Sequence, residues 1–262
     1  MNNIRWSDAI AAEWMKLKHL HAVTWSATLF VFMPLMLAFM LYLGKTPEMA
    51  TSSGMFSMKT GMFVDYEWNG FFMAVLQAGA GLGMVGSGFV ISFVFGREYS
   101  ENTMKDLLAL PTQRWKIVSA KFIISFMWSL LLLMVMLLVV LVSGWILDLQ
   151  AEDQLVWDMS MKFMLMSLMT VMITAPFAIL ASVFKGIMAP LAACIIALIV
   201  GNLVTTIGMG PFFPWTIPAL SALAFEDPGM NVGIIGNVIY ICTLVAGIWG
   251  TIKYWQVADH HG

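Results

Sequence analysis

Charged residues are scarce in this 262-residue sequence: Asp, Glu, Lys and Arg together make up 11% of it, whereas hydrophobic residues make up 60%. A soluble domain of this length needs far more polar surface to cover its core. The formal net charge is −2 and no basic stripe is present, so no nucleic-acid partner is expected. The composition therefore indicates an integral membrane protein.

Histidine and acidic residues are missing from the interior of the apolar runs. All four histidines lie near the two chain ends, and no Asp or Glu lies near the middle of an apolar run. A general base, a metal-ligand set or a proton-carrying carboxylate therefore has no candidate at mid-membrane depth. This disfavours an intramembrane enzyme, a metal site and a proton-coupled carrier.

The sequence also lacks a nucleotide-binding motif. Residues 44–46 look like the end of a phosphate-binding loop, but the glycine that should open the loop is replaced by Phe39. Glycines 81, 83 and 86 match a dinucleotide fingerprint, yet they lie inside an apolar run with no preceding strand. We interpret Gly79 and Gly83, with Gly86 nearby, as small residues that let another helix approach closely.

Six apolar runs are each long enough to cross a bilayer, which takes about 20 helical residues. They lie at residues 22–44, 71–95, 118–147, 158–184, 187–207 and 231–252. We therefore predict an all-α integral membrane protein with six transmembrane helices, forming a single transmembrane domain over residues 1–262. Residues 208–230 are too apolar for an ordinary loop and too rich in proline for a span, which predicts an outer re-entrant segment.

Residues 1–21 have the pattern of an amphipathic helix that lies on the membrane surface. At 100° per residue its apolar side chains gather on one side: Trp6, Ile10, Trp14, Leu17 and Leu20. Glu13 falls in the middle of this apolar face. It can pair with Lys16 at i, i+3, or it can reach a cation of residues 97–121, with Arg97 and Arg114 as the partners to test.

Basic residues are distributed unevenly between the two ends of the spans. With the N-terminus inside, ten of the thirteen lie in inner segments, and the outer side holds Lys45, Lys59 and Lys162. Because cytoplasmic loops carry the excess of Lys and Arg, both termini and residues 97–121 are predicted to face the cytoplasm.

Residues 97–121 form the long charged segment of the chain, with five basic and three acidic side chains. A short helix can begin with Ser100 as its N-cap and end before Pro111. Its apolar residues share one face: Met104, Leu107 and Leu108. An amphipathic connection of this kind at the membrane surface suggests a docking surface for a soluble partner; the alternative is a solvated loop with snorkelling basic residues.

Four polar residues inside the spans are candidates to line a transport pathway: Gln77, Asn202, Thr205 and Thr206. They can equally bond their own backbone or a neighbouring helix. The methionines of the fourth run scatter around the helix, which favours adaptable packing over a copper site.

The central segment resembles a known family through Glu98, Thr103, Leu107, Leu108, Pro111, Arg114 and Lys121. These residues resemble the connection between the second and third spans of type-2 ABC transporter permeases, and most of all the short permeases of bacitracin- and lantibiotic-resistance exporters. The likeness extends to Glu13 and Lys16, to the six spans and to the segment before the last span. It covers nearly the whole chain.

The resemblance implies that residues 96–117 form a cytoplasmic coupling segment, with a helix at 100–111 that sits in a cleft of a separate ABC ATPase. The residues that it assigns to this contact are Glu98, Glu101, Thr103, Met104, Lys105, Leu107, Leu108, Pro111 and Arg114. It also implies two ATPase chains that hold ATP and Mg, and a second permease copy or a sister permease, in a bacterial cytoplasmic membrane.

The expected function is that of the membrane-spanning permease subunit of an ATP-driven exporter, with no catalysis or cofactor of its own. The expected cargo is an amphipathic or hydrophobic molecule, such as a peptide antibiotic, that is moved out of the cell. The alternative is a self-contained secondary transporter or channel, which the lack of a carboxylate inside the spans disfavours.

Overall fold

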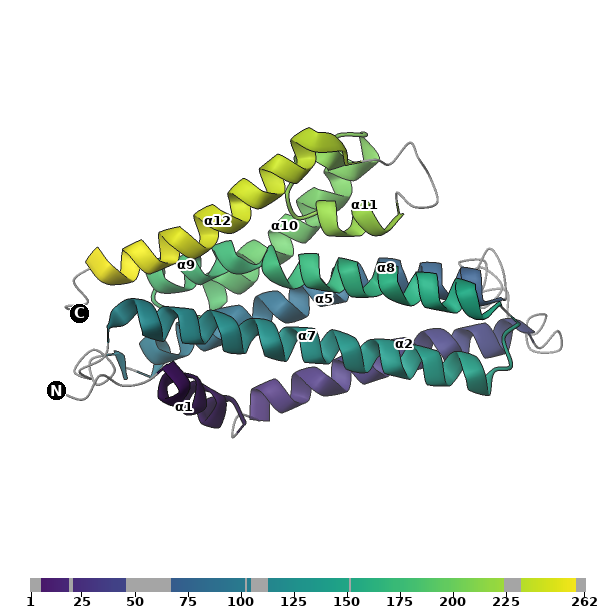
Figure 1. The fold of residues 1–262 in the computed structure, drawn as a ribbon, viewed down its shortest axis with the longest axis horizontal. Coiled ribbons are helices and arrows are strands. Elements are labelled where there is room, and N and C mark those ends of the chain that lie inside the picture. The colour runs from purple at the N-terminus through teal and green to yellow at the C-terminus, as the bar shows by residue number, and fades with distance from the viewer. Residues whose placement is uncertain are drawn as a thin grey trace.

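The computed structural model describes residues 6–18, 21–45, 67–101, 103–104, 113–150, 152–223 and 232–257. Every regular element in these ranges is helical (Figure 1). The helices that follow one another are α1 (Trp6–Lys18), α2 (His21–Lys45), α5 (Trp68–Ser100), α7 (Arg114–Ile146), α8 (Asp153–Met172), α9 (Ala175–Val183), α10 (Met188–Thr206), η1 (Gly210–Phe212), α11 (Ile217–Leu223) and α12 (Gly233–Val257).

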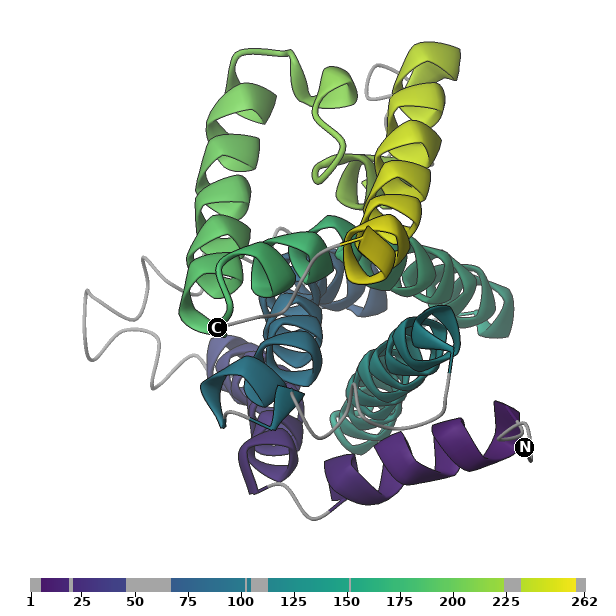
Figure 2. The same cartoon turned by 90° about the vertical axis from the view of Figure 1, so that its left-hand side faces the viewer.

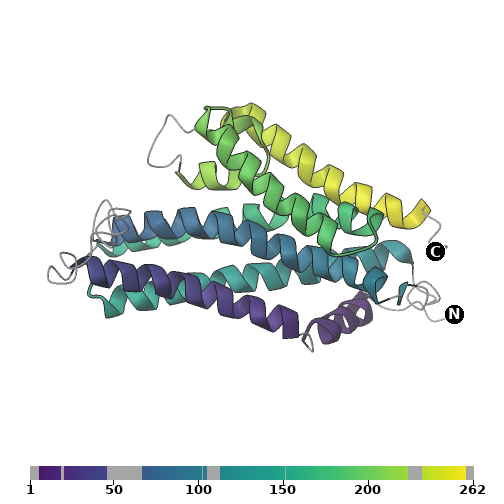
Figure 3. The same cartoon turned by 180° about the vertical axis from the view of Figure 1, so that it is seen from behind.

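Six of these helical stretches are long and apolar enough to cross a membrane. They are α2, α5, α7, the pair α8–α9, α10 and α12, which confirms the predicted all-α membrane architecture with six spans. The helices α2, α5, α7 and α8 run side by side along the long axis, whereas α10 and α12 lean away from them (Figures 1 and 3). α1 crosses α7 at one end of this bundle (Figure 2).

The predicted start of the coupling helix is wrong. Ser100 is the last residue of α5, and its hydroxyl donates to the carbonyl of Gly96 at 3.3 Å, so it is not the N-cap of a new helix. The helix continues beyond the apolar run because Arg97 and Glu98 in its last turn find partners of opposite charge. Residues 105–112, which hold most of the predicted coupling helix, lie outside the described residues.

The fourth span is not the single helix that we predicted. It is interrupted at Ile173 and Thr174, and α9 begins with Pro176 in its first turn. Proline has no backbone N–H to donate to the preceding turn, and its ring collides with that turn. The last span packs against this break: Gly247 lies so close that an added Cβ would be 2.6 Å from the backbone nitrogen of Pro176.

The predicted re-entrant segment is partly described, as η1 and α11. α11 packs against α8 and α5, with Ile217 and Leu220 buried, and it lies between α8 and α12 (Figure 1). Its depth in the bilayer stays a prediction.

Glycines of α5 allow close helix contacts, as predicted for Gly79 and Gly83. A Cβ at Gly79 would lie 2.9 Å from the ring of Phe163 in α8, and one at Gly83 would lie 3.1 Å from Leu133 in α7. A Cβ at Gly81 would have a single neighbouring atom within 4 Å, Leu198 Cδ1 at 3.7 Å, so packing does not require a glycine at this position.

Candidate functional site

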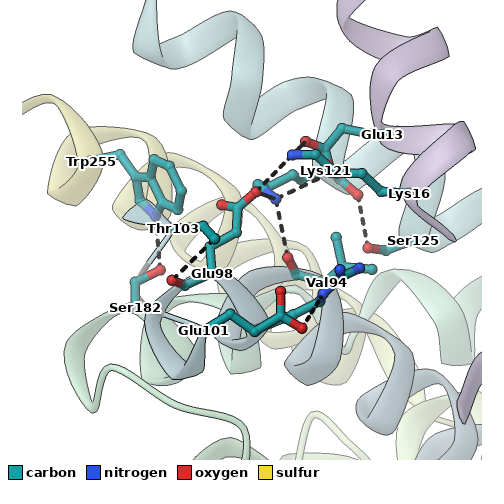
Figure 4. Close-up of polar contacts among 11 residues, drawn as sticks. Glu13, Lys16, Val94, Glu98, Glu101, Thr103, Lys121, Ser125, Ser182 and Trp255 are labelled. Carbon is teal, nitrogen blue, oxygen red and sulfur yellow. Dashed lines mark hydrogen bonds and ion pairs between the residues drawn. The ribbon is translucent and has the colours of Figure 1, made fainter. Parts of the chain in front are cut away.

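Four charged side chains from three helices meet where α1 crosses the bundle. Glu13 and Lys16 come from α1, Glu98 from the last turns of α5, and Lys121 from α7 (Figure 4). We call these four residues the charge cluster.

Each cation of the charge cluster contacts both carboxylates. Lys121 Nζ lies 3.2 Å from Glu13 Oε2 and 2.9 Å from Glu98 Oε1, and it donates to the carbonyl of Val94 at 3.1 Å. Lys16 Nζ lies 3.1 Å from Glu13 Oε1 and 3.0 Å from Glu98 Oε1. The four charges therefore alternate in sign and sum to zero.

The charge cluster is largely removed from solvent. Glu13 is 7% exposed, Glu98 6% and Lys121 1%, while 43% of the Lys16 side chain is exposed. Burying a charge costs several kcal/mol unless opposite charges and hydrogen bonds compensate it. Because that compensation requires all three helices, the cluster ties α1 to α5 and α7.

Both pairings considered for Glu13 are present, but the cation from residues 97–121 is Lys121. Arg97 pairs instead with Glu101 at 2.8 Å, one turn further along the same helix. Arg114 donates to the backbone of α12. Lys121 lies two turns further into α7 than Arg114, and that position faces α1.

Acid is expected to weaken the attachment of α1. Burial raises the pKa of the Glu13 carboxyl, but Lys121 and Lys16 together outweigh burial and lower this pKa below its ordinary value of 4.5. A carboxyl whose pKa is lower in the folded state stabilises that state above the unfolded pKa, and the contribution is lost as pH falls through the folded value. The stability of the protein should therefore begin to fall below pH 4.5.

This acid dependence is measured by following the thermal unfolding of the detergent-solubilised protein against pH. Tryptophan fluorescence includes a signal from the contact of α1 with α7, since the rings of Trp14 and Trp128 lie 6.0 Å apart. In Glu13→Gln, which does not titrate, the decrease below pH 4.5 should be smaller. An identical decrease in the two proteins would contradict a titrating Glu13.

The start of α7 is attached to the opposite side of the bundle. Arg114 Nη1 donates to the carbonyl of Trp255 at 3.1 Å, at the end of α12, where a cation is favourable. The Trp255 side chain is fully buried, and its Nε1 donates to Ser182 Oγ of α9 at 2.8 Å (Figure 4). The end of α5 is thus held by the charge cluster, and the start of α7 is held by α12, which is bonded in turn to α9.

The predicted coupling residues fall into three groups. Glu98, Glu101 and Arg114 are bonded within the chain, as described above, and Thr103 Oγ1 donates to the carbonyl of Glu98 at 3.5 Å. Met104 is 6% exposed and belongs to the main core, so it faces this chain's own interior rather than a partner. The remaining predicted contacts lie outside the described residues: Lys105, Leu107, Leu108 and Pro111.

A cavity of about 470 Å³ lies between α5, α10 and α11. Three of the four predicted pathway residues line it: Gln77, Asn202 and Thr205. The Thr205 hydroxyl donates to the carbonyl of Gly201 in the same helix, so its proton is already hydrogen-bonded. Trp215 and Thr216 also line the cavity, and sequence reasoning missed them because they come from the segment before α11.

Thr206 does not line this cavity. Its hydroxyl donates to the carbonyl of Asn202 on an exposed face of α10. That Thr206 lines a transport pathway stays a prediction.

Six membrane-length helices define a multi-pass membrane protein, and the comparisons with known proteins define its family. The chain belongs to the ABC-2 family of transporter proteins, whose family model matches residues 9–201. This family consists of transport permease subunits.

One similar relative is the bacitracin transport permease protein BCRB of Bacillus licheniformis. It is 25% identical over 177 residues, which cover 66% of this chain and 84% of the relative. The matched family region contains the whole charge cluster.

Proposed function

We propose that this chain is the membrane-spanning permease subunit of an ATP-driven exporter, powered by a separate ATPase, that moves an amphipathic or hydrophobic molecule out of the cell. The observation that carries the proposal is the attachment of the α5–α7 connection at both of its ends. On the α5 side Glu98 joins α1 and α7, and on the α7 side Arg114 joins α12.

This attachment supports a role in transmitting force. The last turn of α5 is bonded to α1 and α7, and the first turn of α7 is bonded to α12. These two helix ends cannot be displaced without moving the helices to which they are bonded, because buried polar groups would lose their partners. A connection bonded to nothing would absorb a displacement. Residues 96–117 are therefore suited to convert the closure of an ATPase pair into helix movement.

The proposed assembly contains two ATPase chains, which hold ATP and Mg, and two permeases, either identical or sisters. The membrane is the cytoplasmic membrane of a bacterium. Both termini and the charge cluster face the cytoplasm, in agreement with the excess of basic residues in those segments. The name of the bacitracin permease relative supports a peptide antibiotic as the cargo, and hence a role in antibiotic resistance.

The cavity between α5, α10 and α11 is the proposed part of the route in this chain. Its lining is mostly apolar, with the amide of Gln77 and the hydroxyl of Thr216 among its few polar groups. A wall of this kind suits an amphipathic molecule, since apolar contact supplies affinity and a few polar groups fix orientation.

Replacing Leu107 with Asp should weaken the association with the partner ATPase about thirtyfold, which corresponds to the loss of one central apolar contact of an interface. The test is co-purification of the chain with its partner ABC ATPase, with the affinity measured by titration in detergent. Leu107→Met is the matched control and should bind normally. Unchanged association of Leu107→Asp, with normal membrane insertion, would contradict the proposal.

A further inference from the structure

A groove walled by tryptophans lies at the end of the molecule opposite the charge cluster. It has a volume of about 600 Å³ and is formed by the start of α5, the end of α7 and the start of α8, at the right of Figure 1. Trp68 is buried in its wall, whereas Trp145 is 82% exposed and Trp157 63% exposed. Asp153 and Ser160 supply polar atoms to an otherwise apolar lining.

The same end of the molecule is acidic. Five exposed carboxylates lie at or near the ends of these helices: Glu67, Asp148, Glu152, Asp153 and Asp158. In the complete sequence, residues 45–70, 148–162 and 208–230 contain nine acidic and only three basic residues. Membrane orientation depends on Lys and Arg, and acidic residues contribute little to it. Membrane orientation therefore does not explain the excess of acidic residues at this end.

Charge and shape together select the class of molecule that fits the groove. Carboxylates attract cations over a distance of about 10 Å at moderate salt, and a tryptophan ring binds a cation on its face. The apolar walls favour an apolar body, and the volume suits a small ligand or a few side chains of a larger one. An anionic lipid or an acidic peptide would be repelled by the rim.

We propose that this groove is a docking site for a cationic amphipathic molecule, such as a peptide that carries primary amines beside apolar side chains. The inference rests on the proposed function, which places this end outside the cell and makes an amphipathic molecule the cargo. It adds the sign of the cargo's charge and the place where the cargo contacts the outer side.

A general role of tryptophan at the membrane surface accounts for only part of this arrangement. Aromatic belts place Trp and Tyr at the level of the lipid headgroups. They do not require Trp145 and Trp157 to enclose a groove, nor an aspartate such as Asp153 in its wall. Both features follow from a site that binds a cation with an apolar part.

The test uses the intact chain in phosphatidylcholine nanodiscs, without the ATPase. The probe is a dansyl-labelled amphipathic peptide of Lys and Leu, and its neutral counterpart has Gln in place of Lys. The cationic probe should bind at least about tenfold more tightly than the neutral one. Its affinity should fall as salt is raised, because the exposed carboxylates are screened.

Variants of the groove should separate specific docking from partitioning into lipid. Asp153→Asn and Trp157→Leu should each weaken binding of the cationic probe about tenfold. Asp153→Glu keeps the charge and should retain most of the affinity. The matched control is Trp249→Leu, which removes a 62% exposed tryptophan of α12 and should bind the probe normally.

Equal binding of both probes, or equal binding by Trp157→Leu and Trp249→Leu, would overturn the proposal. A groove covered by a second copy would overturn it as well, and Trp157→Cys in a Cys242→Ser background would then cross-link two chains. Failure of the proposed function is seen separately, as loss of ATPase association at the other end of the molecule. Groove variants should leave that association unchanged.

Discussion

Replacing Lys121 with methionine is expected to destabilise the folded protein by about 3–5 kcal/mol, the cost of removing one partner from a buried ion pair. Methionine preserves the length of the side chain but removes its charge and its hydrogen bonds. Glu13 and Glu98 would then share Lys16 alone, whose side chain is 43% exposed, and the carbonyl of Val94 would lose the hydrogen bond from Lys121. Equilibrium unfolding in mixed detergent micelles measures the change.

The matched control for this substitution is Lys116→Met, in the first turn of the same helix. Lys116 is half-buried and its Nζ lies 6.0 Å from the centroid of the Trp115 ring. Its replacement should change stability by no more than about 0.5 kcal/mol. Adding Glu98→Gln to Lys121→Met should restore part of the loss, because it removes the excess negative charge. Equal effects of Lys121→Met and Lys116→Met would show that the charge cluster does not stabilise the fold.

Gly96→Ala is expected to cost about 2–3 kcal/mol through overpacking. A Cβ at this position would lie 2.6 Å from the carbonyl oxygen of Gly186 and 2.9 Å from the backbone nitrogen of Ile187. Both atoms belong to backbone, which cannot rotate away as a side chain does. The preceding Lys185 has a φ of 50°, a conformation that few non-glycine residues adopt, so the turn between α9 and α10 has little freedom to shift.

Gly81→Ala, on the same helix, is the control for Gly96→Ala. Its added methyl group meets only Leu198 Cδ1, at 3.7 Å, which is ordinary contact. Since alanine favours a helix over glycine by about 1 kcal/mol, this variant should be neutral or slightly stabilised. The two variants are compared by thermal unfolding in detergent. If Gly96→Ala were as stable as Gly81→Ala, the close approach of α5 to the α9–α10 turn would be wrong.

Much of the fold could be predicted from the sequence, and the predictions that were wrong failed for local physical reasons. All six spans were predicted, but the end of α5 was placed too early, because hydropathy cannot register that Glu98 is neutralised by Lys16 and Lys121. The break in the fourth span was missed, although Pro176 was a signal that could have located it. Three residues predicted to line a pathway lie at one cavity. Trp215 and Thr216 also line it, because the fold brings the segment before α11 there, and no sequence periodicity encodes that fold.

By itself, the sequence determined that this chain is an all-helical membrane protein with six spans. That outcome depends only on the length and polarity of each run, since transfer into lipid is a property of the segment alone. Only the tertiary structure decided that Glu13 meets Lys121, a residue 108 positions away, and that Met104 is turned inward. Such contacts depend on how helices pack: Arg114 and Lys121 lie two turns apart on α7, yet Arg114 bonds α12 and Lys121 bonds α1 and α5.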